Sequence, residues 1–205
     1  SILVTGGEQA GKSLLASKKF LQELVPDIVR AKAAGYDFPL IYWLVAADYD
    51  RTSQEFNYIK QDLDYLGLLH DASKRVDPGF LEVGGGPPGK PVIAIIRTKS
   101  GNDYKTLGKE APMGIIGCEA SQLDLESYLR LVSRQAPHKA WLFLTGTMES
   151  SLGWYPQLRQ TWATGYENKR AFSLPSYSNH YLYPGGKNDP AIIQLRADTP
   201  DDFFL

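Results

Sequence analysis

The sequence predicts an α/β fold with a central, mainly parallel sheet flanked by helices, plus a β-hairpin insertion. Two observations predict it: short apolar segments alternate with segments of helical spacing, and a loop rich in Gly and Pro joins two strand-like segments. The composition, with 43% hydrophobic and 22% charged residues, is typical of a globular protein. A chain of 205 residues is long enough for one domain with a sizeable core.

The first half of the chain predicts two strand–helix units. Residues 2–5 are apolar and predict a buried strand, and residues 13–24 repeat apolar side chains at helical spacing. Residues 38–46 are a second apolar run, which predicts another strand. Residues 53–66 carry apolar side chains on one face, which predicts an amphipathic helix.

The middle of the chain predicts the hairpin and two further strands. Residues 80–83 and 92–98 are strand-like, and we expect the Gly/Pro-rich loop over 84–89 between them to be a mobile surface. Residues 113–118 and 140–145 are short apolar runs that predict buried strands of the sheet.

The remaining segments are a helix and a long polar tail. Residues 123–133 have helical spacing with charges on the outside. The last forty residues are rich in Tyr, Pro, Gly and Asn, and we expect them to be mostly irregular covering structure. The sequence starts and stops abruptly, so we expect it to be a domain excised from a longer chain.

Charge and composition exclude few classes of protein. The net charge of −1 neither favours nor excludes nucleic acid, because a neutral total can hide a basic groove. The single cysteine, Cys118, cannot form an internal disulfide, which suits a reducing compartment. No stretch approaches the roughly 20 apolar residues of a membrane span, so we expect no membrane partner. The three histidines lack the spacing of zinc ligands.

The run from Gly6 to Ser13 predicts a phosphate-binding loop. It fits G-x-x-x-x-G-K-[ST] between a strand and a helix, where backbone N–H groups and a helix N-terminus converge on phosphate oxygens. Lys12 would reach the β- and γ-phosphates, and the Ser13 hydroxyl would bind Mg²⁺. The alternative is a chance match in a glycine-rich turn. The pattern predicts a P-loop NTPase of the ASCE/RecA-like class whose ATP-binding residues are Gly6, Gly7, Glu8, Gln9, Ala10, Gly11, Lys12, Ser13 and Leu14.

Glu119 is the predicted catalytic carboxylate, because it follows an apolar strand and could polarise the attacking water as a general base. The preceding position, which is normally acidic, is Cys118, and a thiol is a poor partner for Mg²⁺. Metal binding would then depend on Ser13 and on Glu119, partly through water. The alternative is that Glu119 only caps the following helix.

The strand over 140–145 runs into Thr145-Gly146-Thr147. Small hydroxyl residues at a strand end beside the loop can sense the γ-phosphate through hydrogen bonds. The alternative is an ordinary turn at the end of a strand.

In this order the segments resemble the ATPase domain of the large terminase subunit of tailed bacteriophages and prophages, the motor that packages DNA into procapsids. The strand end "LTGT", followed by an acidic residue and Trp154, is the more diagnostic part. The likeness covers most of the chain and includes "VTGGEQAGKSLLAS", "YWLVAADYDRTSQEFNYIKQDL", "GIIGCEASQLDLESYLRLVSRQAP", "WLFLTGTMESSLGWYPQL" and "SYSNHYLYPGG".

The resemblance implies an ATPase that uses ATP and Mg²⁺ to move viral double-stranded DNA into procapsids. Lys12 and Glu119 would be catalytic, Ser13 and Glu119 would serve the metal, and residues 145–147 would couple hydrolysis to movement. Gln9 stands where the family often has Arg. Residues 1–175 would form the ATPase domain, and residues 176–205 would be an irregular lid or linker leading to a nuclease domain that this sequence lacks.

The resemblance also implies partners. They are double-stranded DNA, the portal protein, the small terminase subunit and further copies of the chain in a ring on the portal, all in the host cell cytoplasm. A neighbouring subunit would supply an arginine to the site. The candidates, each of which can equally be an ordinary surface charge, are Arg51, Lys105, Lys109 and Arg134.

Two alternatives remain open from the sequence. One is another P-loop ATPase that translocates DNA. The other is a nucleotide-binding switch with little turnover, which Cys118 in place of the usual acidic residue keeps possible.

Overall fold

The computed structural model describes residues 1–84, 91–103, 105–148 and 153–198. Over these residues one sheet has eight strands in the order β3-β4-β5-β2-β6-β7-β1-β8. The strands are β1 (Ile2–Gly6), β2 (Leu40–Ala46), β3 (Leu69–Ala72), β4 (Phe80–Gly84), β5 (Val92–Ser100), β6 (Gly114–Gly117), β7 (Trp141–Gly146) and β8 (Arg170–Leu174).

The sheet is mostly parallel, as predicted. The six strands from β5 to β8 in the spatial order all pair in parallel, whereas β3 and β4 are antiparallel to their neighbours. The antiparallel pair β4–β5 is the predicted hairpin, and β3 extends it by a strand that was not predicted. Most of the Gly84–Gly89 loop lies outside the described residues.

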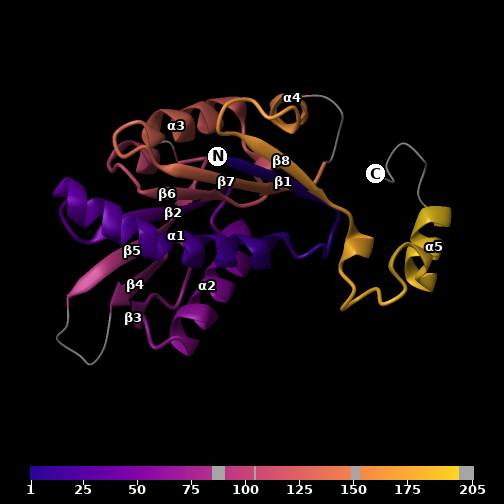
Figure 1. Cartoon of the computed structure of the whole chain (residues 1–205), viewed down its shortest axis with the longest axis horizontal. Coiled ribbons are helices and arrows are strands. Elements are labelled where there is room, and N and C mark those ends of the chain that lie inside the picture. Colours follow the sequence, from indigo (N-terminus) through magenta and orange to yellow (C-terminus); the bar gives the residue numbers. More distant parts are fainter. Residues whose placement is uncertain (85–90, 104, 149–152, 199–205) are drawn as a thin grey trace.

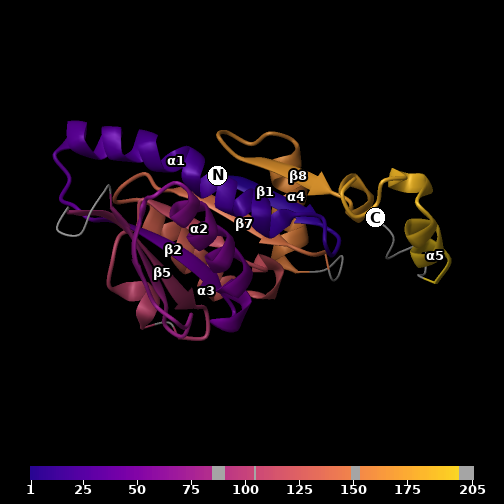
Figure 2. The same ribbon diagram turned by 90° about the horizontal axis from the view of Figure 1, so that it is seen from below.

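Helices cover both faces of this sheet (Figures 1 and 2). The first two pack on one face and the next two on the other, because successive strand residues point to opposite faces: Tyr42 and Leu44 of β2 face one core cluster, and Trp43 and Val45 the other. The last helix stands apart from the sheet. The helices are α1 (Lys12–Ala34), α2 (Ser53–Tyr65), α3 (Leu125–Gln135), α4 (Trp154–Ala163) and α5 (Pro190–Asp198).

The expectation of a mostly irregular tail is wrong in two places. β8 pairs with β1 along its whole length, and α5 is helical. Neither element has a clear apolar face by which the sequence would predict it. β8 is an edge strand, half-exposed or exposed throughout, and only Ile192 of α5 is buried. The helix predicted over 13–24 continues to Ala34 with Pro26 inside it, and α4 was not predicted. No helix in the described part of the chain is both long enough and apolar enough to cross a membrane.

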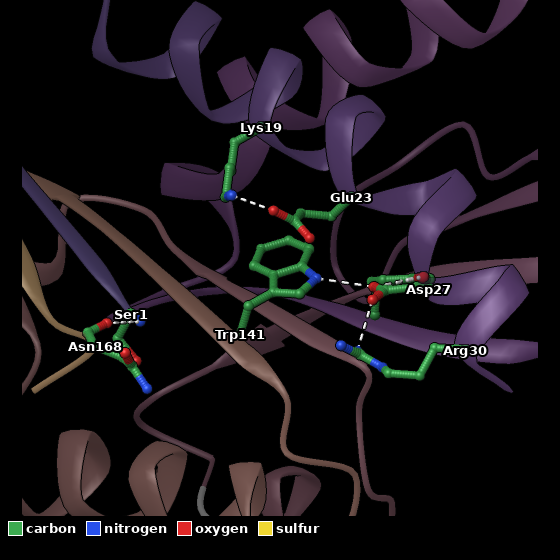
Figure 3. A network of polar contacts seen from close by, with 8 residues as sticks. Ser1, Lys19, Glu23, Asp27, Arg30, Trp141 and Asn168 are labelled. Carbon is green, nitrogen blue, oxygen red and sulfur yellow. Dashed lines mark hydrogen bonds and ion pairs between the residues drawn. The ribbon is translucent and has the colours of Figure 1, made fainter. Parts of the chain in front are cut away.

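A buried carboxylate ties α1 to the sheet (Figure 3). Asp27 has a fully buried side chain and accepts hydrogen bonds from the Tyr42 hydroxyl (3.0 Å), the Trp141 indole nitrogen (2.9 Å) and the Arg30 guanidinium (2.7 Å). The Trp141 ring needs the glycine on the next strand, since a Cβ on Gly114 would lie 2.1 Å from it. One side chain thus joins α1, β2 and β7.

Replacing Asp27 by Ala is expected to cost about 3–5 kcal/mol of unfolding free energy, because buried donors lose their acceptor. Urea denaturation measures it. The control is Glu126→Gln, which breaks the exposed ion pair between Glu126 and Arg130 on α3 and should cost under about 1 kcal/mol. Equal, small losses in both variants would contradict the structural role of Asp27.

The stability that Asp27 contributes is expected to depend on pH. Burial raises the pKa of Asp27 above its ordinary value of 3.8, although Trp141, Arg30 and Tyr42 oppose the shift. The folded state then binds more protons than the unfolded state, so this contribution falls as pH rises from about 3.8 through the folded pKa. The difference in unfolding free energy between the native chain and Asp27→Asn should show this slope. A difference that does not change with pH would contradict it.

Candidate active site

Three chain segments meet at the edge of the sheet where parallel strands end. The Gly6–Ser13 loop follows β1, Glu119 follows β6, and Thr147 follows β7, which lies between them. Parallel neighbours bring their carboxyl ends to one edge, where open α/β sheets bind ligands. All three segments line one cavity of about 850 Å³, to which Arg51 also contributes.

The loop has the backbone of a cradle between strand and helix. β1 ends at Gly6, and α1 begins at Lys12. Gly11 has φ of 88°, a left-handed conformation that favours glycine, and Gln9 also has a positive φ of 57°. The first turn of α1 closes with a bond from the Leu15 N–H to the Gly11 carbonyl (3.0 Å). The N-terminal residues of α1, Lys12 to Leu14, line the cavity.

Lys12 links the loop to β7. Lys12 is buried, with 7% of its surface exposed. Its ammonium donates to the carbonyls of Gly6 (3.0 Å) and Gly7 (2.9 Å). A third bond reaches the Thr147 hydroxyl (3.2 Å). Burial lowers the pKa of Lys12, and nearby carboxylates, Glu119 foremost, oppose this. A buried cation among carboxylates is suited to hold an anionic ligand.

Ser13 faces the first turn of α2. Its hydroxyl donates to the amide oxygen of Gln54 (3.1 Å). Glu55 is 2% exposed, and burial raises its pKa. Sequence reasoning missed Glu55, although a signal existed: it lies one turn before Ile59, on the apolar face of the predicted helix.

Cys118 is a fully buried thiol beside that carboxylate. Burial, reinforced by the Glu55 and Glu119 carboxylates, raises the pKa of Cys118 well above its ordinary value. The thiol is therefore neutral, and it can act only as a weak hydrogen-bond donor or acceptor.

Glu119 adopts a left-handed backbone conformation, with φ of 43° and ψ of 49°, before the turn over Ala120–Gln122. Non-glycine residues rarely adopt it, and such strain, of order 1–3 kcal/mol, clusters at functional sites. Its side chain makes no capping bond to that turn, so the helix-cap alternative is wrong. Glu119 lines the cavity instead, half-buried, opposite the Gly6–Ser13 loop.

The three residues Thr145, Gly146 and Thr147, at and just after the end of β7, have different environments. Thr145 is buried and donates to the Gly117 carbonyl (3.3 Å), which ties β7 to β6. A Cβ on Gly146 would lie 2.8 Å from the Tyr155 hydroxyl, so only glycine fits there. Thr147 alone reaches the cavity, where it accepts the bond from Lys12.

The tail after β8 contacts the Gly6–Ser13 loop. Ser176 donates to the Glu8 carbonyl (2.8 Å), and Asn179 donates to the Gln9 carbonyl (2.7 Å). The Tyr183 hydroxyl donates to the Gln9 side chain (3.3 Å), so the tail engages Gln9 through both its backbone and its side chain. The tail residues that also line the cavity are Asn179, Tyr181 and Leu182.

The other candidates lie in different places. Arg51 lines the cavity and pairs with Asp48 (2.8 Å). Lys105 and Lys109 line a second cavity of about 720 Å³, and Arg134 lies in the last turn of α3. Trp162 of α4 belongs to the core cluster on this face of the sheet, and Trp154 packs against that cluster.

The residues at the cavity fit a Mg²⁺ ion that takes most of its ligands from phosphate and water. The Ser13 hydroxyl and the Glu119 carboxylate are oxygen donors, which Mg²⁺ prefers. In the described part of the chain no three His, Cys, Asp or Glu side chains gather into a group that could hold a metal. A protein cage for the metal is therefore not expected among these residues.

The Gly6–Ser13 loop packs closely against the end of β8 and the start of the tail. This packing predicts different losses of unfolding free energy for two glycine substitutions. A Cβ at Gly6 would lie 2.2 Å from the Leu174 backbone oxygen, whereas at Gly7 it would meet the movable Ser176 hydroxyl at 2.2 Å. We expect Gly6→Ala to cost roughly 1–3 kcal/mol of unfolding free energy and Gly7→Ala less. Adding Ser176→Ala should relieve Gly7→Ala but leave Gly6→Ala unchanged. Thermal denaturation checks this, and no relief of Gly7→Ala would contradict the contact.

No protein-family model and no curated protein matches the sequence. Solved structures do match over nearly the whole chain. The large terminase ATPase domain of Thermus phage P74-26 has a TM-score of 0.67 at 16% identity, covering 99% of this chain and 84% of that one.

The large terminase of another phage, a thermophilic bacteriophage, matches in two nucleotide complexes. In complex with ADP it has a TM-score of 0.72 at 13% identity, covering 100% of this chain and 46% of that one. In complex with ATP-gamma-S it has a TM-score of 0.69 at 11% identity. This chain thus spans about half the length of that large terminase. The described structure is a P-loop NTPase fold, and it has the architecture of large terminase ATPase domains.

Proposed function

We propose that this chain is an ATPase and that it serves as the motor domain of a large terminase subunit. The observation that carries the proposal is the meeting of Lys12, Glu119 and Thr147 at one cavity where β1, β6 and β7 end. A cation for phosphate, a carboxylate for water and a hydroxyl on the next strand are the groups that phosphoryl transfer to water needs.

In this proposal the Gly6–Ser13 loop and Leu14 bind the phosphates of ATP. The start of α1 lines the cavity, where the backbone N–H groups and the helix dipole favour negative charge. Lys12 exchanges its bonds to the Gly6 and Gly7 carbonyls for bonds to phosphate oxygens. Glu119 accepts a proton from the attacking water as a general base. Mg²⁺, bound through Ser13, would neutralise charge on the phosphates.

The segment Thr145–Thr147 would pass the state of the site to the rest of the sheet. Thr147 shares a hydrogen bond with Lys12, so a change in the lysine's partners acts directly on the end of β7. Gly146 lies against Tyr155 of α4, whose hydroxyl donates to the Val4 carbonyl of β1 (3.3 Å). The coupling would therefore run from the lysine through β7 to α4.

The nucleotide is proposed to be ATP because the large terminase of the thermophilic bacteriophage, which shares this fold, has been solved with ADP and with ATP-gamma-S. The tail would close over the base: Tyr181 is 92% exposed at the cavity and offers an aromatic face to a purine. Residues 1–175 would then be the ATPase domain, and the segment from 176 onward its lid or linker.

The architecture of the fold supports a larger function. We propose that hydrolysis drives viral double-stranded DNA into procapsids in the host cell cytoplasm, with copies of the chain in a ring on the portal protein together with the small terminase subunit. A neighbour's arginine would complete the site. Of the basic candidates from the sequence, Arg51 lines this chain's own cavity. Nuclease activity is not proposed for these residues.

A second candidate function is a nucleotide-binding switch with little turnover. The neutral, buried Cys118 at the family's metal-ligand position favours it. Turnover, rather than binding, separates the two functions.

Glu119→Gln is expected to abolish hydrolysis while ATP affinity stays within about 3-fold, because the amide keeps the shape but cannot accept the proton; general-base loss typically costs 10²–10⁴ in rate. Steady-state hydrolysis with Mg²⁺ measures it over a range of protein concentrations. A rise in specific activity with concentration would support sites completed between subunits.

The control for that experiment is Glu126→Gln on α3, an exposed carboxylate that does not line the cavity. It should retain native turnover. If the native chain binds ATP but neither it nor Glu119→Gln hydrolyses ATP at any protein concentration, the result would favour the switch and contradict the ATPase.

A further inference from the structure

Gln54 is a cavity residue to which the proposed mechanism gives no role. It lies in the first turn of α2. Arg51, Gln54 and Tyr58 all line the cavity that also contains the Gly6–Ser13 loop. Helical residues three and four positions apart lie on one face. The face that starts just before α2 and continues along it therefore forms a wall of the proposed nucleotide site.

The Gln54 side chain contacts the phosphate loop at Ser13. The Ser13 hydroxyl donates a hydrogen bond to the Gln54 amide oxygen over 3.1 Å, and Ser13 itself lines the cavity. Because the partner atom is a carbonyl oxygen, which can only accept, the hydroxyl must be the donor. The hydroxyl proton of Ser13 is thus held on the side of the oxygen that faces α2.

Two further contacts hold α2 in this position beside α1. Ser17, one turn after Ser13 on α1 and fully buried, donates to the Asp62 carboxylate (3.0 Å). Lys18 pairs with the same carboxylate at 2.6 Å. Asp62 lies about two turns after Gln54, so α1 and α2 are joined at successive points along their length. The place of Gln54 beside Ser13 is therefore supported by the packing of two helices.

The chemistry of a serine hydroxyl shows what this bond can do. The hydroxyl has one proton to donate and two lone pairs to offer, and only a lone pair can bind a cation. In the described part of the chain no three His, Cys, Asp or Glu side chains gather into a metal site. A Mg²⁺ ion would therefore have few protein oxygens to bind, and the direction of the Ser13 proton matters correspondingly more.

We propose that Gln54 is a positioning residue for the metal ion of a bound nucleotide: it accepts the Ser13 proton and so leaves a lone pair of the Ser13 oxygen for Mg²⁺. This inference rests on the proposed nucleotide site. Gln54 acts through Ser13, so it is not a catalytic residue. Groups that orient a metal ligand change metal affinity roughly 10- to 100-fold.

The test measures how Mg²⁺ and nucleotide support each other's binding, rather than turnover. The affinity of the full 205-residue chain for methylanthraniloyl-ADP, a fluorescent ADP analogue, is determined with Mg²⁺ and with EDTA, and the ratio is the metal coupling. Gln54→Leu should lower this coupling about 10-fold, while the affinity in EDTA stays within about 2-fold. The matched control is Gln61→Leu, an exposed glutamine of the same helix that does not line the cavity, which should change neither.

A second variant tests the direction of the hydrogen bond. Gln54→Glu keeps an acceptor in place and gives it charge, which strengthens the bond, so its metal coupling should equal or exceed that of the native chain. If Gln54→Glu loses coupling as Gln54→Leu does, acceptance of the Ser13 proton is not the role of this side chain, and the inference is overturned.

A double-mutant cycle tests the route through Ser13. If Gln54 acts by orienting that hydroxyl, Gln54→Leu should lower the metal coupling no further in a Ser13→Ala background. Effects of the two substitutions that multiply would show that Gln54 acts by another route, which contradicts the positioning role.

The outcomes separate this inference from the proposed function. If the affinity of the native chain does not respond to Mg²⁺, the proposed nucleotide site fails and the inference fails with it. If the native chain responds and Gln54→Leu responds equally, only the role of Gln54 is overturned. Melting curves establish that each variant is folded. Should Gln54→Leu unfold, Gln54→Ala is measured in its place, with the same expected loss of coupling.

Discussion

The parallel pairing of β6, β7 and β1 is the constraint on which the candidate site depends. Thr5 is in register with Gly146, and Gly117 with Leu144, so the three strands end together. Residues more than a hundred positions apart in the chain therefore meet at one edge. In an antiparallel sheet alternate strands would end at opposite edges, and the phosphate loop could not face both Glu119 and Thr147.

The first helix serves the site at one end and the core at the other. Lys12 begins α1 at the cavity, and Asp27 fixes the same helix to β2 and β7 through buried hydrogen bonds. Gly114 makes room for the Trp141 ring that completes this attachment. A helix held so firmly behind the site keeps the N–H groups of its first turn in position, which is the preorganisation that electrostatic catalysis requires.

Charge is concentrated where the strands end. Lys12 is buried among carboxylates that oppose the effect of burial on its pKa, and Glu119 is held beside it in a strained backbone conformation. Glu55, in the first turn of α2, is a further buried carboxylate whose charge acts on Lys12. The three residues come from three elements, so no single stretch of sequence contains the site.

The sequence by itself determined the local features: the Gly6–Ser13 loop between a strand and a helix, the carboxylate after β6 and the hydroxyl residues after β7 all follow from short patterns. Only the tertiary structure decided that Glu55 is buried and that the tail from Ser176 to Tyr183 lies on the loop. Glu55 is one polar residue on an ordinary amphipathic helix. β8, which carries the tail to the loop, is an edge strand with little buried surface, so its place comes from backbone pairing with β1, which leaves no pattern of side chains to recognise.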